Sequence, residues 1–165
     1  MPRRVVSTVL ALVLAFSAVR LAADSKPALS GVVAGIELCP QFICGFALFV
    51  GGFEGELNSR PASGAFAATV THDPLPAPLS SAAITGGQWT ITAGRCVLHG
   101  DVVDGSILTL LSGTQFCVTM ELEITSGGKG QLFFTGLLDH GPFPPTIAGV
   151  VGQSPAPCSI LAAGN

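Results

Sequence analysis

Apolar and polar residues alternate along much of the chain, which is the pattern of half-buried β-strands. In segment 116–124 every second residue is apolar, from Phe116 to Ile124, and the residues between them are small or acidic. Successive side chains of a strand point to opposite faces, so this pattern gives one face to a core and the other to solvent. Similar alternation begins at Phe66 and at Trp89.

Further apolar runs, separated by glycine or proline, extend the pattern over the rest of the chain. The additional strand candidates are 32–38, 43–50, 53–57, 97–103, 107–111, 130–138 and 147–151. Helices do not compete, because glycines recur every few residues and each costs about 1 kcal/mol inside a helix. About eight or more short strands predict a single-domain antiparallel β-barrel, with a β-sandwich as the alternative. Glycine density favours the barrel, since glycine permits sharp coiling and bulges.

The N-terminus has the features of a secretory signal peptide. Arg3 and Arg4 precede an apolar run over 5–19, and small residues suitable for cleavage follow near Ala23. A membrane-spanning helix needs about 20 apolar residues, so the run is short for an anchor. We therefore expect a secreted or periplasmic protein with no membrane span after cleavage. The expected segments are a signal peptide at 1–23, a polar lead-in at 24–30, a β domain at 31–152 and a Pro/Ala-rich tail at 153–165.

The charge of the expected mature chain argues against nucleic acid as a partner. Four lysine and arginine residues remain after cleavage against ten acidic residues, which gives a net charge near −6. A phosphate-backbone binder needs clustered basic side chains to release counterions. Such a chain is therefore not expected to bind nucleic acid.

Five cysteines follow the signal peptide, and an exported protein is expected to use them in disulfides. Cys39 and Cys44 bracket a short loop, and Cys96 and Cys117 flank a predicted pair of strands. We expect these two pairs to be the bridges. Because the number is odd, Cys158 is left as the candidate free or intermolecular thiol.

One five-residue pattern, His-x-Pro-x-Pro, follows a strand-like run at two places. It begins at His72 and again at His140, and in both copies a Phe lies six residues earlier on the same strand face. We interpret the repeat as one architectural corner used twice, in which His ends an apolar face at the barrel rim and donates to a loop carbonyl. A functional role depends on whether the two histidines share an end of the fold.

The three histidines also allow two chemical hypotheses. Each of His72, His99 and His140 has an aspartate one or two residues away, and zinc-binding histidines often have a carboxylate behind them. A three-histidine metal site and acid–base use of His72 or His140 are therefore alternatives. Against them, adjacent strand residues point to opposite faces, so the neighbouring aspartates are poorly placed to orient the imidazoles. No metal or other cofactor is predicted.

Large aromatic side chains fall on the predicted inward faces, where they form either a solid core or the lining of a ligand cavity. The candidates for such a cavity are Phe66, Trp89, Phe116 and Phe134. The sequence of the glycine-rich turn and of the Leu-Phe-Phe-Thr-Gly136 segment that follows it resembles sequences of small antiparallel barrels that bind or isomerise hydrophobic molecules. A small apolar ligand or self-association is accordingly the expected kind of interaction.

The sequence favours a non-enzymatic binding or structural component of the cell envelope or secretome, since no nucleophile motif such as Gly-x-Ser-x-Gly is present. The first alternative is a barrel for an apolar ligand, in the form of an isomerase or cyclase-type enzyme. The second is a metal-dependent enzyme that uses His72, His99 and His140.

Overall fold

The computed structural model of the protein describes residues 26–39, 44–74, 81–110 and 114–159, apart from the Cys39 side chain. The expected signal peptide at 1–23 lies outside this part of the chain. The described residues form eight antiparallel strands: β1 (Leu29–Cys39), β2 (Ala47–Leu57), β3 (Arg60–His72), β4 (Ser81–Ala93), β5 (Cys96–Thr109), β6 (Gln115–Ser126), β7 (Gly130–Asp139) and β8 (Thr146–Gly152). Among the described residues no helix is long and apolar enough to span a membrane.

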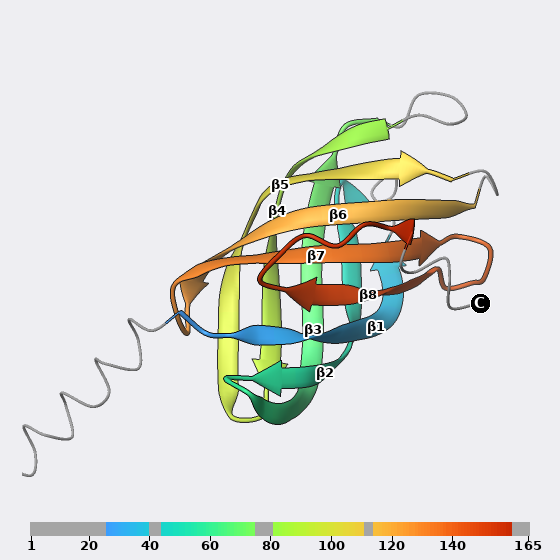
Figure 1. Ribbon diagram of the computed structural model, residues 1–165. Helices are drawn as coiled ribbons and strands as arrows, with labels where there is room; N and C mark the ends of the chain where they lie inside the picture. The colour runs from blue at the N-terminus through green and yellow to red at the C-terminus, as the bar shows by residue number, and fades with distance from the viewer. Residues whose placement is uncertain (1–25, 40–43, 75–80, 111–113, 160–165) are drawn as a thin grey trace, which may run out of the picture.

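Each strand pairs with its neighbour in sequence, and β8 pairs with β1, so the sheet closes into a barrel (Figure 1). The predicted barrel is confirmed. The sandwich alternative is wrong, because the single sheet has no unpaired edge. The β1–β8 register, with Val33 opposite Gly149, brings the beginning and end of the domain together.

Two predicted breaks between strands do not occur. Segments 43–50 and 53–57 were expected as two strands, but β2 runs from Ala47 to Leu57 without interruption, and Ile43 lies outside the described residues. Segments 97–103 and 107–111 are likewise joined in β5, which ends at Thr109. The glycines at which we expected the strands to end remain paired with the neighbouring strand; Gly51, for example, pairs with Gly35. In β5 the register shifts between Val102 and Asp104, which bends the strand instead of ending it.

Glycines inside the barrel make room for aromatic rings, which explains why this composition can fill a small barrel. The Phe134 ring lies over the cross-strand pair of Gly136 and Gly149, where a Cβ on Gly149 would come within 2.6 Å of the ring. Phe53 covers Gly31 in the same way, at 2.7 Å. Phe134 also stacks on Phe66, with ring centroids 6.4 Å apart. The aromatic rings of the core therefore pack on glycine backbone, and aliphatic side chains fill the rest of the interior.

The two ends of the barrel differ in how their strands are joined. At one end, which we call the tight-turn end, Asn58 and Ser59 form a two-residue hairpin with φ of 52° and 62°. The lead-in to β1 is tied to this turn, since Ala28 N–H donates to Asn58 Oδ1 at 3.0 Å and the Ala28 carbonyl accepts from Asn58 N–H at 2.8 Å. Pro27 beside them is buried.

The opposite end, which we call the long-loop end, carries the connections 40–46, 73–80, 110–114 and 140–145. The β5 and β7 arrowheads point to it on the right of Figure 1. Longer connections on a rigid scaffold are where binding residues most often lie.

The disulfide arrangement differs from the predicted one. Cys117 is bonded to Cys158, with Cα atoms 6.1 Å apart, and Cys96 is a free, half-buried thiol. The predicted Cys96–Cys117 pair is therefore wrong, and Cys158 is not the free cysteine. The register gives the reason: Cys96 pairs with the core residue Ala93, whereas Cys117 lies between inward-facing neighbours and points outward.

The bridge fixes a C-terminal strap, residues 153–159, to the outer wall of the barrel. Thr135, on the outer face of β7, donates its hydroxyl to the Ala156 carbonyl at 2.7 Å. Gln153 Nε2 donates to the Pro27 carbonyl at 3.1 Å. Cys44 is also disulfide-bonded, but the predicted Cys39–Cys44 pair involves a side chain outside the described part.

Candidate functional site

The two histidines of the repeated motif lie at the same end of the barrel. β3 and β7 run in the same direction, because successive strands alternate, and both finish at the long-loop end. His72 is the last residue of β3, and His140 directly follows β7. Three strands lie between β3 and β7 in either direction around the ring of eight, so the two corners stand on opposite sides of the barrel.

His99 does not join them. It lies on β5 opposite Thr90, with its Nδ1 2.8 Å from the Thr90 hydroxyl oxygen, and it is exposed on the outer wall. Its other strand partner is Ser126, at the end of β6 toward the tight turns. Within the described segments, no group of three or more His, Cys, Asp or Glu side chains is placed to hold a metal ion. The structure thus does not assemble the three-histidine metal site.

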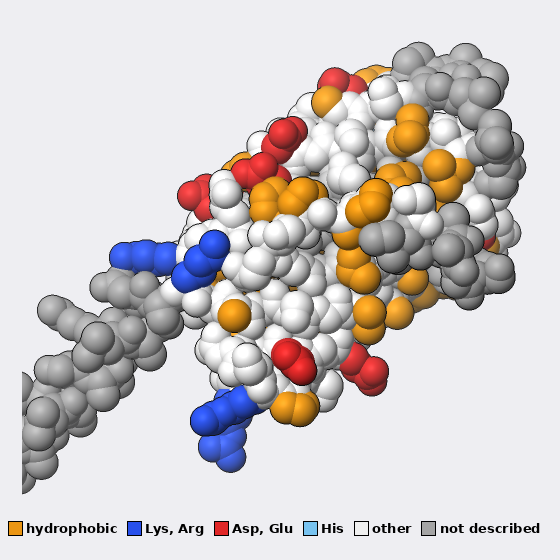
Figure 2. Space-filling model, in the orientation of Figure 1, with side chains coloured by type: hydrophobic (Ala, Val, Ile, Leu, Met, Phe, Trp, Pro, Cys, Tyr) orange, Lys and Arg blue, Asp and Glu red, His pale blue; other side chains and the backbone are white. Residues whose placement is uncertain are grey.

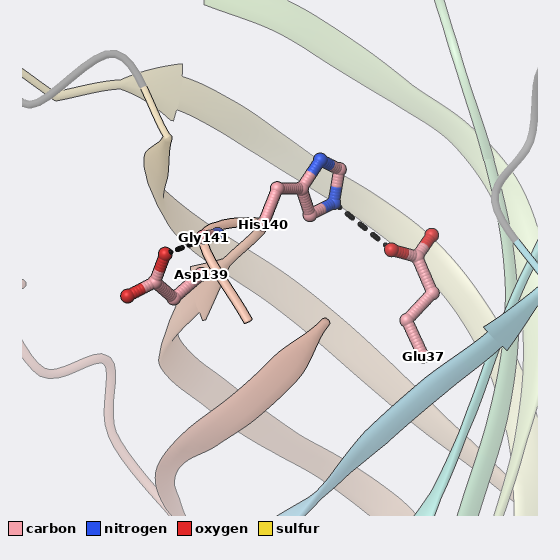
Figure 3. A network of polar contacts seen from close by, with 4 residues as sticks. All are labelled: Glu37, Asp139, His140 and Gly141. Atoms are coloured by element: carbon pink, nitrogen blue, oxygen red, sulfur yellow. Dashed lines mark hydrogen bonds and ion pairs between the residues drawn. The ribbon is translucent and has the colours of Figure 1, made fainter. Parts of the chain in front are cut away.

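The two motif histidines have different partners. His72 Nδ1 donates to the Asp73 carbonyl oxygen at 2.7 Å, the contact with a loop carbonyl that the repeat predicts. His140 instead directs its Nε2 toward the Glu37 carboxylate, at 2.9 Å from Oε2 (Figure 3). The carboxylate behind His140 therefore comes from β1, and not from its neighbour Asp139.

Glu37 is the central residue of this site. Its carboxylate is 3% exposed, and it is the one charged side chain that is fully buried among the described residues. Its backbone N–H donates to the Pro145 carbonyl at 2.9 Å, which ties β1 to the connection that carries His140. His140 is the ion-pair partner of Oε2 by distance, but no aligned hydrogen bond reaches that oxygen in the described part of the chain.

A second set of contacts holds the His140 corner in place. Asp139 Oδ1 accepts from Gly141 N–H at 2.7 Å, and Asp139 Oδ2 accepts from Gln115 Nε2 at 3.2 Å. These hydrogen bonds, that of Gly141 first, lower the pKa of Asp139 below its usual 3.8. The His140 N–H donates to the Thr114 carbonyl at 2.9 Å. In Figure 3 the Asp139 side chain points away from the imidazole and toward Gly141.

The surroundings of the Glu37–His140 pair are apolar. The Phe116 ring lies against the His140 imidazole, with centroids 5.1 Å apart. Leu138 pairs with Phe116 across β6 and β7 and with Ile147 across β7 and β8, and both Leu138 and Ile147 are buried. Several large apolar side chains are also exposed around this end of the barrel. They are Leu38, Phe46, Leu108 and Phe143.

The aromatic residues proposed as a ligand cavity fall into two groups. Phe66, Trp89 and Phe134 are 2–4% exposed and packed in the core cluster, where they fill the interior. Phe116 is half-buried at the long-loop end and contacts His140. Of the four, only Phe116 is part of the site described here.

Glu37 was not recognised from the sequence, although a signal was present. Residues 33, 35 and 37 share one strand face, and Val33 on that face is apolar, so the alternation already placed the carboxylate toward the core. A charged residue on the inward-facing side of a strand is the feature that points to Glu37, because charged side chains are rarely fully buried unless they are paired.

Comparisons of the chain with protein-family models, with curated proteins and with solved structures found no match.

Proposed function

We propose that the protein is an exported, non-catalytic binding protein whose ligand site is the Glu37–His140 pair at the long-loop end of the barrel. The observation that carries the proposal is the Glu37 side chain, which is 3% exposed and whose Oε2, although 2.9 Å from His140 Nε2, accepts no aligned hydrogen bond from the described residues. A ligand that donates a hydrogen bond would supply what this oxygen lacks. Export is supported by the disulfide-bonded cysteines, since such bonds persist in oxidising compartments.

Glu37 is a poor choice for the stability of the fold, which favours a binding role for it. Moving a carboxylate into an apolar interior costs several kcal/mol, and one ion pair rarely more than offsets that cost. A leucine at this position would extend the apolar face that Val33 begins. A buried charge at the end of a barrel, where ligand sites commonly lie, is better explained by a ligand that uses it.

The ligand class follows from the chemistry of the surroundings. Glu37 favours a hydroxyl or amine head group, because a carboxylate accepts hydrogen bonds and attracts positive charge. Phe116 and the exposed Phe143, which is 98% accessible, offer apolar contact for the rest of the molecule. Since Phe66 and Phe134 occupy the interior, the ligand is expected to lie across the end of the barrel and not deep inside.

A series of amphiphiles with the same chain tests the proposal. Decylamine, decanol and decanoate, each kept below its micelle concentration, are titrated into the exported protein while backbone amide NMR shifts are followed. Shifts at Phe116, Leu138 and His140 with the amine or alcohol, and weaker binding of the carboxylate, support the proposal. Equal binding of all three, or shifts elsewhere, would contradict it.

A second candidate function uses the same pair as a proton shuttle. Glu37 and His140 stand 2.9 Å apart, so one group could take a proton from a bound apolar molecule while the other returns one at a different atom. This would be an isomerase. Its test is a product of unchanged mass but altered NMR spectrum after incubation with a bound ligand, and loss of that product in Glu37→Gln.

A further inference from the structure

All lysine and arginine side chains of the described residues lie at the tight-turn end of the barrel. They come from four separate segments and are all exposed: Lys26, Arg60, Arg95 and Lys129. In Figure 2 the blue side chains gather on the left and lower left, at the end where β1 begins. The described parts of the long-loop connections carry no lysine or arginine, but include Asp73.

The contacts at this end join the four segments in two pairs. The Lys26 side chain lies over Gly130, where an added Cβ would meet its Cγ at 3.2 Å, and so beside Lys129. The Gly94 N–H donates to the Ser63 carbonyl at 3.0 Å, which places the turn with Arg95 against the start of β3. The turn residues 58–59, 94–95 and 127–129 include no acidic residue.

We propose that the tight-turn end docks on the surface of a bilayer rich in anionic phospholipids. Exposed lysines and arginines are attracted to such a surface within about a Debye length. The expected mature chain is acidic, so the attraction comes from the placement of the charge at one end and not from its total.

Two further features support a bilayer as the partner. The expected signal peptide, with its apolar run 5–19, precedes Lys26 in the sequence, and β1 begins at this end, so we expect this end to be the one nearest the membrane during export. The wall beside it carries acidic pairs directly across β5 and β6, Asp101 with Glu123 and Asp104 with Glu121. These pairs would repel an anionic surface and keep the barrel upright.

This inference is independent of the ligand site, which lies at the other end and would face away from the membrane. The test is co-sedimentation of the exported protein with phosphatidylglycerol–phosphatidylcholine vesicles and with pure phosphatidylcholine vesicles. We expect binding to the first only, and its loss at high salt. Arg60→Gln and Arg95→Gln should each weaken binding about fivefold, the equivalent of one cation near an anionic surface.

Two further variants separate the position of the charge from its amount. Glu56→Gln and Asp73→Asn each raise the net charge by one, but Glu56 lies near the tight-turn end and Asp73 at the opposite end. Glu56→Gln should strengthen binding severalfold, whereas Asp73→Asn should not change it. All variants involve exposed side chains, and a thermal melt verifies that each is folded.

Several results would overturn the proposal. Equal binding to neutral vesicles would assign attachment to an apolar segment. Equal effects of Glu56→Gln and Asp73→Asn on vesicle binding would mean that binding depends on the net charge of the protein and not on the position of the charge. Binding to soluble dextran sulfate without binding to vesicles would mean that this end binds an acidic polymer instead of a bilayer. Binding to neither would mean that this end is not a binding surface for anionic partners.

Discussion

His140 Nε2 lies 2.9 Å from Glu37 Oε2, across the junction between the β7–β8 connection and β1. The equivalent His72 of the other motif copy donates to the carbonyl of its own neighbour Asp73. The same five-residue pattern thus places one histidine against a loop carbonyl and the other against a buried carboxylate. The difference arises from the neighbouring strand, because Glu37 of β1 faces the core near His140.

The Glu37–His140 pair predicts unequal effects of removing each partner. His140→Ala leaves a buried carboxylate without its ion-pair partner and should lower the free energy of unfolding by about 3 kcal/mol. Glu37→Leu removes the buried charge and should be neutral or stabilising by about 1 kcal/mol. Urea denaturation followed by Trp89 fluorescence measures both, since Trp89 is the single tryptophan and is buried.

His72→Ala is the matched control for this comparison. His72 is partly exposed and its Nδ1 bonds to a carbonyl near solvent, so its loss should cost less than about 1 kcal/mol. A cost for Glu37→Leu as large as that for His140→Ala would mean that Glu37 stabilises the fold. That outcome would remove the energetic argument for a binding role.

The corner at Asp139 should contribute stability that depends on pH. The pKa of Asp139 is lower in the folded protein than its ordinary 3.8, so its contribution is complete above that value and is lost as the pH falls through the folded-state pKa. An NMR titration of the Asp139 carboxyl group should give a midpoint below 3.8. Gln115→Ala removes one donor and should move that midpoint upward; a midpoint at 3.8 in both proteins would show that the hydrogen bonds do not form in solution.

The Cys117–Cys158 bridge should stabilise the fold through the strap. The two cysteines are 41 residues apart, and loop closure of that length corresponds to about 4 kcal/mol in the chain-entropy model. Cys158→Ser should therefore lower the free energy of unfolding by about 2–4 kcal/mol. Alkylation of the unfolded, unreduced protein should modify Cys96 but neither Cys117 nor Cys158, and Cys96→Ser should abolish that modification. Alkylation of Cys158 would contradict the bridge.

The packing of Phe134 on glycine predicts a contrast between two identical substitutions. A Cβ at Gly136 would overlap the Phe134 ring at Cζ, and would lie 2.7 Å from its Cε1 and 3.0 Å from the Ala148 carbonyl oxygen, whereas one at Gly152 meets nothing within 4 Å. Gly136→Ala should cost about 1–3 kcal/mol because the ring must move in a filled core. Gly152→Ala, on the adjacent strand, should stay within about 0.5 kcal/mol of wild type. Thermal melts of both variants test this, and equal melting temperatures would contradict the packing.

The barrel was predictable because its strands alternate clearly, as in segment 116–124, and because short strands with frequent turns allow few architectures. Glycine was misleading in β2, where Gly51 and Gly52 were expected to end a strand. Their role, close approach of Gly51 to Gly35 on the next strand, depends on a pairing that local patterns do not contain.

The site was only partly predictable for the same reason. His140 was identified by its repeat, but its partner Glu37 is about a hundred residues earlier in the chain, and β1 meets the β7–β8 connection only when the barrel closes. The cysteine pairing failed similarly. Sequence spacing favoured Cys96 with Cys117, yet the two side chains lie on opposite faces of the sheet.

The most direct test of the binding site is an NMR titration of decylamine into wild type, Glu37→Gln and Glu54→Gln. Glu54 is an exposed glutamate on the outer face of β2 and serves as the control. Loss of a charge-assisted contact should weaken binding about tenfold or more. The account predicts saturable shifts at Phe116, Leu138 and His140 in wild type and Glu54→Gln, and binding weakened by at least about tenfold in Glu37→Gln. Equal affinity of all three proteins for decylamine would contradict it.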